Sequence, residues 1–429
     1  MPRIEQKTLA DLGRPDYSFY LFNRNPFRAM PVATQEPDFL TDRDRVFMEL
    51  RRTIETSLYD QRMNGRILIA NFGMGKSHIL KYIRRRINLD LRERPGGSGI
   101  SAYTIPGKSM LDLYIGVIED LGEEFLIEVS SAISRAHPEV RPEPTPGTQY
   151  ELWSDIAGRG YYVPEHVSRL WQALPRGAQR RMDKDHFAAL MFVQDDKRRD
   201  DALYWLQGGS PPKVRRDAMG ISSLITRDTA EKAFVSLVEA IRQAGYSHFY
   251  LCLDEMEKLT YLSPRLQSEY FEQLRHVIDQ LTEGLSIFWA VTPDAWQVLE
   301  DARHAFQSRL RGFPTLELPP MAPQDVIQLV CEYMSKERIV YAESDEYPYD
   351  QVARSVQELN LLVGVEGQLA LELFPFSPNV IEAVAEQTRG NPRDILKACA
   401  WLIDSGYDRQ KVYYDVDETL ELLGLQQQQ

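Results

Sequence analysis

The stretch Ala70-Asn71-Phe72-Gly73-Met74-Gly75-Lys76-Ser77 decides the fold of this chain. It comes directly after the apolar run 67–69 and directly before a helix-like stretch, 78–87. Strand, glycine loop and helix follow one another in the order that a phosphate-binding loop requires. Glycines let successive backbone N–H groups turn inward onto phosphate oxygens, and the helix N-terminus adds partial positive charge. The sequence therefore predicts a site for the phosphates of a nucleotide.

Two side chains of this loop carry specific roles in the prediction. We expect Lys76 to reach the β- and γ-phosphates of ATP and the Ser77 hydroxyl to hold Mg²⁺. The residues that we expect to contact the nucleotide here are Asn71, Phe72, Gly73, Met74, Gly75, Lys76, Ser77 and His78.

One position departs from the usual motif. The pattern calls for glycine first, and this chain has Ala70, the smallest substitute, which tolerates only part of the dihedral range of glycine. The alternative interpretation is a chance Gly-Lys-Ser in a surface turn. The strand before the loop and the helix after it favour nucleotide binding.

The composition is that of a globular protein without a membrane segment. The 429 residues suffice for two or three domains, and 43% of them are hydrophobic. No apolar stretch approaches the ~20 residues that a membrane span needs. Cys252, Cys331 and Cys399 are scattered in apolar contexts, which indicates buried thiols rather than disulfides or a zinc site. Together with a polar N-terminus, these features favour a cytoplasmic protein.

The charge argues against a surface that is wholly devoted to nucleic acid, because the net charge is −13. A local basic cluster does follow the phosphate loop. A solvated helix face is its first interpretation, and contact with nucleic acid is the alternative. The cluster consists of Lys81, Arg84, Arg85, Arg86, Arg92 and Arg94.

Short apolar runs alternate with helical periodicity along much of the chain. We expect strands at 66–69, 100–105, 249–253, 286–291 and 315–318. Continuously apolar runs suit buried parallel strands, so the predicted fold class is α/β, with a parallel sheet flanked by helices. The expected parts are an N-terminal segment (1–45), the α/β core (46–110 and 220–320), a mostly helical insertion (111–219) and a C-terminal helical lid (321–425).

A pair of acids ends the apolar run 249–253. Two carboxylates at the end of a buried strand are costly unless they have a function. We expect Asp254 to bind Mg²⁺, directly or through water, and Glu255 to orient and polarise the water that attacks the γ-phosphate. The alternative is an acid pair that merely caps the next helix, and the loop at 70–77 counts against it.

Three further side chains complete the expected site. Thr292 follows the strand 286–291 and is the candidate for a hydroxyl near the γ-phosphate, with an ordinary Thr-Pro turn as the alternative. Arg309 is the candidate for an arginine that reaches the nucleotide of a neighbouring subunit, with Arg303 and Arg311 as alternatives and a solvated arginine equally open. Arg393 follows Gly390-Asn391-Pro392 in the first turn of a helix, from which it can contact the γ-phosphate; a simple helix-start arginine is the alternative.

These elements in this order resemble an AAA+ ATPase, with a P-loop core and a helical lid. Within that class the chain resembles the origin-recognition/initiator-like branch. It is most similar to the bacterial P-loop ATPases of bacteriophage-exclusion (BREX-type) defence systems. The residues that carry the narrower match are Tyr204-Trp205-Leu206-Gln207-Gly208, Met219-Gly220-Ile221, Ala244-Gly245-Tyr246 and Leu253-Asp254-Glu255-Met256-Glu257-Lys258-Leu259.

The resemblance implies ATP hydrolysis, a homo-oligomer, and coupling to DNA or to DNA-bound proteins in genome defence. The sheet motifs cover 45–110 and 220–405, and the stretch 111–219 matches only at its end. Ala70 departs from the family pattern, from which we expect slower turnover. Little sequence follows the lid, so we expect no C-terminal winged helix.

Three interpretations follow. The first is a motor or switch ATPase, in which hydrolysis is coupled to subunit rearrangement. The second is a nucleotide-gated scaffold that does not hydrolyse ATP and binds partner proteins through 111–219. The third is a small-molecule phosphotransferase, against which the pair Asp254-Glu255 and the arginine at 393 both count.

Overall fold

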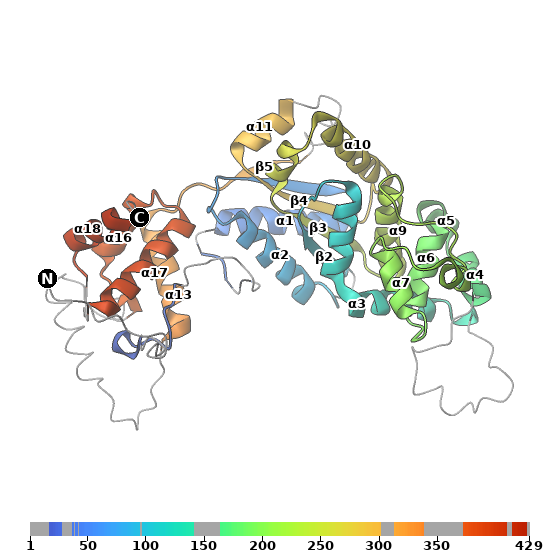
Figure 1. Ribbon diagram of the computed structural model, residues 1–429, viewed down its shortest axis with the longest axis horizontal. Coiled ribbons are helices and arrows are strands. Elements are labelled where there is room, and N and C mark those ends of the chain that lie inside the picture. Colours follow the sequence, from blue (N-terminus) through green and yellow to red (C-terminus); the bar gives the residue numbers. More distant parts are fainter. Residues whose placement is uncertain are drawn as a thin grey trace, which may run out of the picture.

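The core of the molecule is a five-stranded sheet in the strand order β2-β3-β4-β1-β5. The computed structural model describes residues 17–27, 37, 39–41, 43–94, 97–140, 164–301, 313–338, 372–409 and 414–426. Figure 1 shows the sheet near the centre of the molecule with helices around it. The strands are β1 (Asn64–Ile69), β2 (Gly99–Thr104), β3 (His248–Leu253), β4 (Leu285–Val291) and β5 (Thr315–Glu317).

Every strand pairing in this sheet is parallel. The predicted α/β fold class is therefore confirmed, and the strands lie where the apolar runs indicated. β4 lies between β1 and β3, with Ile69 opposite Val291 and Leu253 opposite Trp289. The carboxyl ends of these three strands consequently meet at one edge of the sheet.

Helices cover both faces of the sheet, and alternate residues of each strand face one side or the other. On one face α1 (Asp44–Asp60) and α2 (Lys76–Asp90) pack over Leu68, Tyr250 and Phe288. On the other face Ile67, Leu251, Ile287 and Trp289 belong to the largest hydrophobic cluster. The helices of that cluster include α3 (Met110–Ala136), α9 (Ala230–Gln243), α10 (Pro264–Gln280) and α11 (Pro293–Asp301).

The described residues 110–140 and 164–218 after β2 are largely helical, and they share the core of the sheet. The helix α3 packs directly against β2 and α9. Buried residues of the following helices, such as Phe187 and Trp205, join the same cluster as the strands. These helices are α4 (Pro164–Ala173), α5 (Arg176–Arg181), α6 (Lys184–Phe192), α7 (Arg199–Leu206) and α8 (Lys213–Ala218).

The C-terminal helices form a second cluster that lies beside the core, on the left in Figure 1. They are α13 (Pro323–Glu337), α16 (Pro378–Gln387), α17 (Pro392–Asp408) and α18 (Val416–Gln426). We call this helical group the lid. Tyr20, Phe22 and Phe27 from the start of the chain are buried in the same cluster. The described residues 17–27 are therefore part of the lid, a contact that the sequence did not predict.

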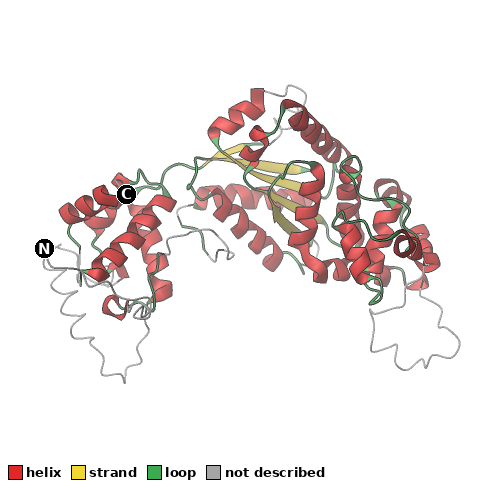
Figure 2. Ribbon diagram, in the orientation of Figure 1, coloured by secondary structure: helices red, strands yellow, loops and turns green. Residues whose placement is uncertain are grey.

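Helices make up most of the described chain, and strands occur only in the central sheet (Figure 2). Within the described ranges, no helix combines the length and the hydropathy that crossing a bilayer demands. Cys252 and Cys399 are buried as predicted, but Cys331 is only partly buried. The prediction for Cys331 was wrong because Val326, Val330 and Met334 form the buried side of α13, and Cys331 only packs against the border of their cluster.

Two buried histidines predict a loss of stability in mild acid. Burial lowers the pKa of His186 and of His248 to about 4 in each case. Between pH 6.5 and 4 the unfolded chain takes up protons at these residues that the folded protein does not bind. The free energy of unfolding should therefore fall by about 2 kcal/mol per histidine between pH 7 and pH 5.

The measurement is the thermal midpoint across this pH range for the wild type, His186→Gln and His248→Gln. Each substitution should flatten the pH dependence, because glutamine binds no proton. If the thermal midpoint of both variants depended on pH as steeply as that of the wild type, these histidines would not be the cause of the loss of stability in acid.

Candidate functional site

The loop after β1 adopts a conformation that requires glycine at two positions. Gly73 has φ +82° and Gly75 has φ +90°, in the left-handed region that other residues avoid. Gly75 is the N-cap of α2, which begins at Lys76. Ala70 is buried and is not among the residues of positive φ, so alanine causes no backbone strain where the motif has its first glycine.

Lys76 is a buried ammonium held by the loop itself. Its side-chain Nζ donates hydrogen bonds to the carbonyl oxygens of Ala70, at 2.6 Å, and Asn71, at 3.2 Å. Nζ also lies 5.5 Å from the centre of the Phe72 ring. Burial lowers the pKa of Lys76, and the carboxylates of Glu257 and Asp254 oppose this effect.

Asp254 is the buried acid at the end of β3, with 2% of its surface exposed. Its Oδ2 accepts a hydrogen bond from the Tyr103 hydroxyl at 2.5 Å, and its Oδ1 accepts one from the Glu255 N–H at 2.9 Å. Burial and the neighbouring carboxylate raise the pKa of Tyr103 well above its usual range. Tyr103, which sequence reasoning missed, thus remains a hydrogen-bond donor that fixes the Asp254 carboxylate.

Glu255 turns the chain sharply at the end of the strand. Its φ of +53° places it in the left-handed region, which is costly for a residue with a side chain and often marks a functional site. Its carboxylate forms an ion pair with Lys258 in the same short helix, and 44% of the side chain is exposed. That helix, η5 (Met256–Tyr261), packs against β4 and α11.

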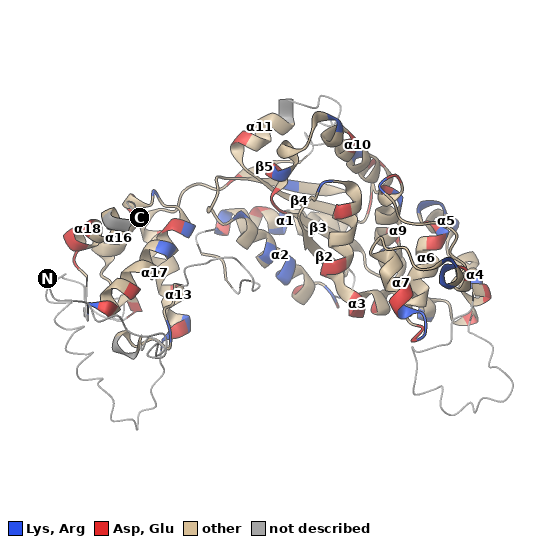
Figure 3. Ribbon diagram, in the orientation of Figure 1, with Lys and Arg blue, Asp and Glu red and all other residues tan. Residues whose placement is uncertain are grey.

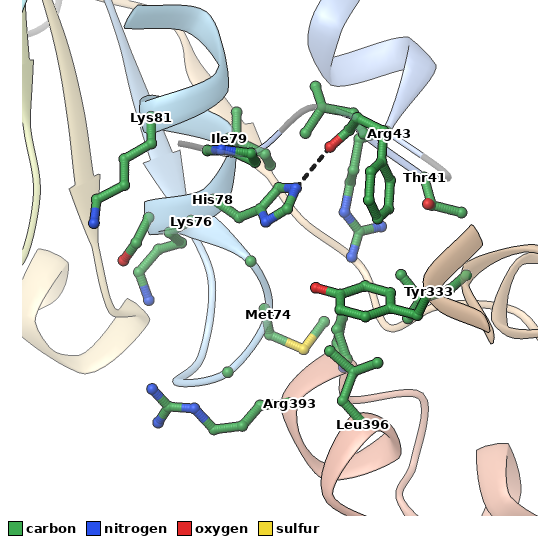
Figure 4. Close-up of a pocket in the computed structure, with 18 of the residues that line it drawn as sticks. Thr41, Arg43, Met74, Lys76, His78, Ile79, Lys81, Tyr333, Arg393 and Leu396 are labelled. Atoms are coloured by element: carbon green, nitrogen blue, oxygen red, sulfur yellow. Dashed lines mark hydrogen bonds between the residues drawn. The ribbon is translucent and has the colours of Figure 1, made fainter. Parts of the chain in front are cut away.

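A pocket of about 770 Å³ lies between the core and the lid, a size typical of ligand sites. It brings together residues from the phosphate loop, the acids after β3 and the first turn of α17. In Figure 4 the side chains of Lys76 and Arg393 extend to the same side of the loop. The predicted residues that line it are Phe72, Gly73, Met74, Gly75, Lys76, Ser77, His78, Asp254, Glu255 and Arg393.

The lid contacts the phosphate loop directly. Asn391 caps α17 by accepting a hydrogen bond from the Arg393 N–H, and its Nδ2 donates to the Phe72 carbonyl at 2.9 Å. The Arg393 N–H also lies 3.3 Å from the Gly73 carbonyl oxygen. Arg393 therefore lies in the first turn of a lid helix, as predicted, and its backbone is held beside the phosphate loop.

The far end of the pocket is aromatic, a feature that was not predicted from the sequence. Phe39 packs edge-on against Tyr333 of α13 and against His78 of α2. The His78 Nε2 lies 2.7 Å from the Phe39 carbonyl oxygen, and the Lys336 Nζ lies 4.1 Å from the centre of the Phe39 ring. A short segment before α1 thus contacts both the core and the lid. It has no periodic pattern of apolar residues from which this contact could have been predicted.

Some predicted residues lie elsewhere. Thr292 is buried directly after β4, between the ends of β1 and β3, but it does not line the pocket. Asn71 does not line it either and contributes its carbonyl to Lys76. Arg309 and its alternatives, Arg303 and Arg311, lie outside the described residues.

Three of the six residues in the basic cluster after the loop form ion pairs with acids. Arg84 pairs with Asp120 at 3.0 Å, Arg86 with Asp90 at 2.7 Å, and Arg92 with Glu128. Figure 3 shows the mixed charge around α2 and α3. These pairs favour a solvated helix face over a surface for nucleic acid.

Oxygen donors of the kind that Mg²⁺ prefers are present in the pocket, in the Ser77 hydroxyl and the Asp254 carboxylate. Both residues line the same cavity, so the donor chemistry fits this ion. Within the described ranges there is no group of three or more His, Cys, Asp or Glu residues that could hold a metal by itself.

The two loop glycines give a matched test of the contact between loop and lid. A Cβ on Gly73 would lie 2.4 Å from the Asn391 Oδ1, whereas a Cβ on Gly75 would meet nothing within 4 Å among the described residues. Gly75→Ala should cost about 1–2 kcal/mol of stability from the left-handed backbone alone. Gly73→Ala should cost more, because the lid must also move.

The measurement is thermal unfolding of both variants without nucleotide. Equal losses in the two variants would contradict the contact between Gly73 and the lid.

One family model and several solved structures match parts or most of this chain. A family model described as "BREX system ATP-binding protein BrxC/D" matches residues 186–329. No curated protein matches the chain. Solved structures that match the chain include ORC2 of Aeropyrum pernix, with 10% identity, 94% of this chain and 72% of that chain covered, and a TM-score of 0.49. Cdc6p of Pyrobaculum aerophilum matches with 12% identity, coverage of 90% and 66%, and a TM-score of 0.41. The RuvB branch migration motor of Thermotoga maritima matches with 11% identity, coverage of 91% and 72%, and a TM-score of 0.35.

Identities and TM-scores this low say nothing about what this chain binds. The family match is of a different kind, since it spans β3, β4 and the acids between them. The chain is thus similar over residues 186–329 to the BREX system ATP-binding proteins BrxC/D, and the resemblance that its motifs predicted is confirmed.

Proposed function

We propose that this chain binds and hydrolyses ATP as an AAA+ switch or motor, acting as a homo-oligomer on DNA or on DNA-bound proteins in bacterial defence against phages. One observation carries the proposal: the loop glycines, Lys76, Asp254 and Arg393 line a single pocket between the core and the lid. The match to a family described as ATP-binding supports it.

The phosphate end of the site is assigned to the loop and the acids. Backbone N–H groups of the loop and the first turn of α2 cradle the phosphates, and Lys76 leaves the Ala70 carbonyl to reach the β- and γ-oxygens. Ser77 and Asp254 hold Mg²⁺, which neutralises charge on the phosphates when bound. Arg393 contacts the γ-phosphate from the lid. Thr292 is buried at the end of β4 and does not line the pocket, so it is assigned no contact with the phosphates.

The other end of the pocket is assigned to the nucleoside. Aromatic and apolar side chains from three parts of the chain meet there, which suits a flat base rather than a charged group. Phe39 comes from the segment before α1, Met74 from the loop, and Tyr333 and Leu396 from the lid. Occupation of this end links core and lid through the ligand.

Hydrolysis is assigned to Glu255, which accepts a proton from the attacking water. Its carboxylate must first leave Lys258, with which it is paired. In an oligomer, Arg309 of a neighbouring subunit stabilises the charge that develops on the transferred phosphoryl group. A chain that binds ATP without hydrolysing it, and serves as a scaffold for partner proteins, is the second candidate. The exposed, ion-paired state of Glu255 favours it.

Lys76→Ala tests nucleotide binding. Loss of the ammonium should weaken ATP binding at least about tenfold, because a buried charge that faces the phosphates is removed. Lys213→Ala, on the exposed face of α8, is the matched control and should bind ATP as the wild type does. Binding is measured by titration calorimetry with ATP and Mg²⁺. Equal affinity in all three proteins would refute the site.

Glu255→Gln separates the two candidate functions. If the chain is an ATPase, the variant should keep ATP affinity and lose about a hundredfold or more in phosphate release, since glutamine accepts no proton. Glu269→Gln, a surface acid paired with Arg265, is the control with unchanged turnover. Phosphate release is measured with and without added DNA. A wild type that binds ATP but releases no phosphate under either condition supports the scaffold.

A further inference from the structure

Tyr103 is a pocket residue to which the proposed function assigns no role. It lies near the end of β2, the strand next to β3, and its partly buried side chain lines the pocket together with Ser77 and Asp254. Its hydroxyl donates a hydrogen bond to the Asp254 Oδ2 at 2.5 Å, at the short end of the range for a hydroxyl and a carboxylate. Tyr103 therefore touches the carboxylate to which the proposed function assigns Mg²⁺.

Tyr103 is also held in place by contacts that do not involve Asp254. Its backbone N–H donates to the Asp120 Oδ2 of α3 at 2.8 Å, and Asp120 is paired with Arg84 of α2 at 3.0 Å. The Lys81 Nζ of α2 lies 5.0 Å from the centre of the Tyr103 ring, within the distance of a cation–π contact. A donor that is anchored by two other helices can fix a carboxylate rather than follow its movements.

The Asp254 carboxylate is fixed from two sides and keeps acceptor sites for an ion. Its Oδ1 accepts the Glu255 N–H at 2.9 Å, and the Asp254 backbone N–H donates to the Thr104 carbonyl oxygen of β2 at 3.0 Å. Each oxygen of an ionised carboxylate has two lone pairs, and the Tyr103 hydroxyl and the Glu255 N–H take one on each oxygen. The second lone pair of each oxygen can therefore accept the ion or one of its water ligands while both hydrogen bonds persist.

We propose that Tyr103 positions Asp254 for Mg²⁺ and thereby sets how much the ion adds to nucleotide binding. This inference rests on the proposed function. A residue that hydrogen-bonds a metal ligand fixes the orientation of that ligand, and its loss typically costs about 10–100-fold in metal affinity. Tyr103 is a positioning residue, because it acts through Asp254 and is assigned no contact with the nucleotide or the ion.

The opposite interpretation is that the hydroxyl competes with the ion for the Asp254 Oδ2. The lone pairs that remain on the carboxylate count against it, because the hydrogen bond does not have to break when the ion binds. The two interpretations predict effects of opposite sign. Loss of the hydroxyl weakens the contribution of Mg²⁺ if Tyr103 positions Asp254, and strengthens it if Tyr103 competes.

Tyr103→Phe is the test, since it removes the hydroxyl and keeps the ring beside Lys81. The probe is an ATP analogue that resists hydrolysis, and its Kd is measured by titration calorimetry once with Mg²⁺ and once with EDTA. The ratio of the Kd in EDTA to the Kd in Mg²⁺ measures what the ion adds to binding. In Tyr103→Phe this ratio should fall by about tenfold, with the Kd in EDTA within about twofold of that of the wild type.

Tyr250→Phe is the matched control. Tyr250 is buried on β3, does not line the pocket, and donates its hydroxyl to the Ile54 carbonyl oxygen at 3.3 Å. Each substitution removes one hydroxyl hydrogen bond, so each should lower the thermal midpoint without nucleotide by about 2–4 °C. The control should keep the wild-type ratio of the two Kd values. A merely structural Tyr103 would behave as this control does.

A double variant shows whether Tyr103 acts through Asp254. Asp254→Asn alone should lower the ratio, and adding Tyr103→Phe to it should change the ratio no further, because both residues act through one carboxylate. The same titrations with the analogue give this result. An additional fall in the double variant would mean that Tyr103 acts elsewhere, and it would overturn the proposal.

The remaining outcomes separate this inference from the function on which it rests. A ratio in Tyr103→Phe that equals or exceeds that of the wild type overturns the role of Tyr103 and leaves nucleotide binding intact. A wild type that does not bind the analogue, or binds it equally in Mg²⁺ and in EDTA, overturns the assigned nucleotide or metal site and with it this inference. A lowered ratio that depends on Asp254 supports both.

Discussion

The position of β4 between β1 and β3 is the constraint on which the rest of the site depends. Neighbouring strands lie about 4.8 Å apart, so the loop after β1 and the acids after β3 emerge about 10 Å from one another. This gap is wide enough for the phosphate group and metal ion that we propose between Lys76 and Asp254. If β1 and β3 were direct neighbours, Asp254 would crowd the loop. The order of the strands therefore determines the distance between the loop after β1 and the acids after β3, whichever side chains these segments carry.

A second constraint is that the pocket exists only where three separate parts of the chain meet. The core supplies the loop and the acids, α17 supplies Asn391 and Arg393, and the segment around Phe39 closes the aromatic end. Backbone contacts with the lid involve the same loop carbonyls that border the phosphate site. A ligand that changes the conformation of this loop must therefore also change its contacts with the lid. In this way the nucleotide that we propose could alter how the core and the lid are arranged.

Much of this architecture could be predicted from the sequence, and the gaps have physical causes. The strands and the loop were readable because buried parallel strands are continuously apolar and because left-handed positions demand glycine, as at Gly73 and Gly75. The contacts of Phe39 and Tyr20 could not be predicted, because they join residues some 300 positions apart and no periodic sequence pattern marks them. The burial of Glu257 could not be predicted for another reason: spacing in a sequence does not reveal which of two nearby acids, Glu255 or Glu257, is buried.

The two acids also show how stability and function oppose one another at this site. A buried polar atom without a partner costs about 1–3 kcal/mol, and a residue with a side chain in the left-handed region costs a similar amount. Glu257 and Glu255 carry one such cost each, within three residues of Asp254. A chain selected only for folding would replace both with residues that avoid these penalties. Their concentration at the edge where β1, β4 and β3 end is the expected mark of a site that is completed by its ligand.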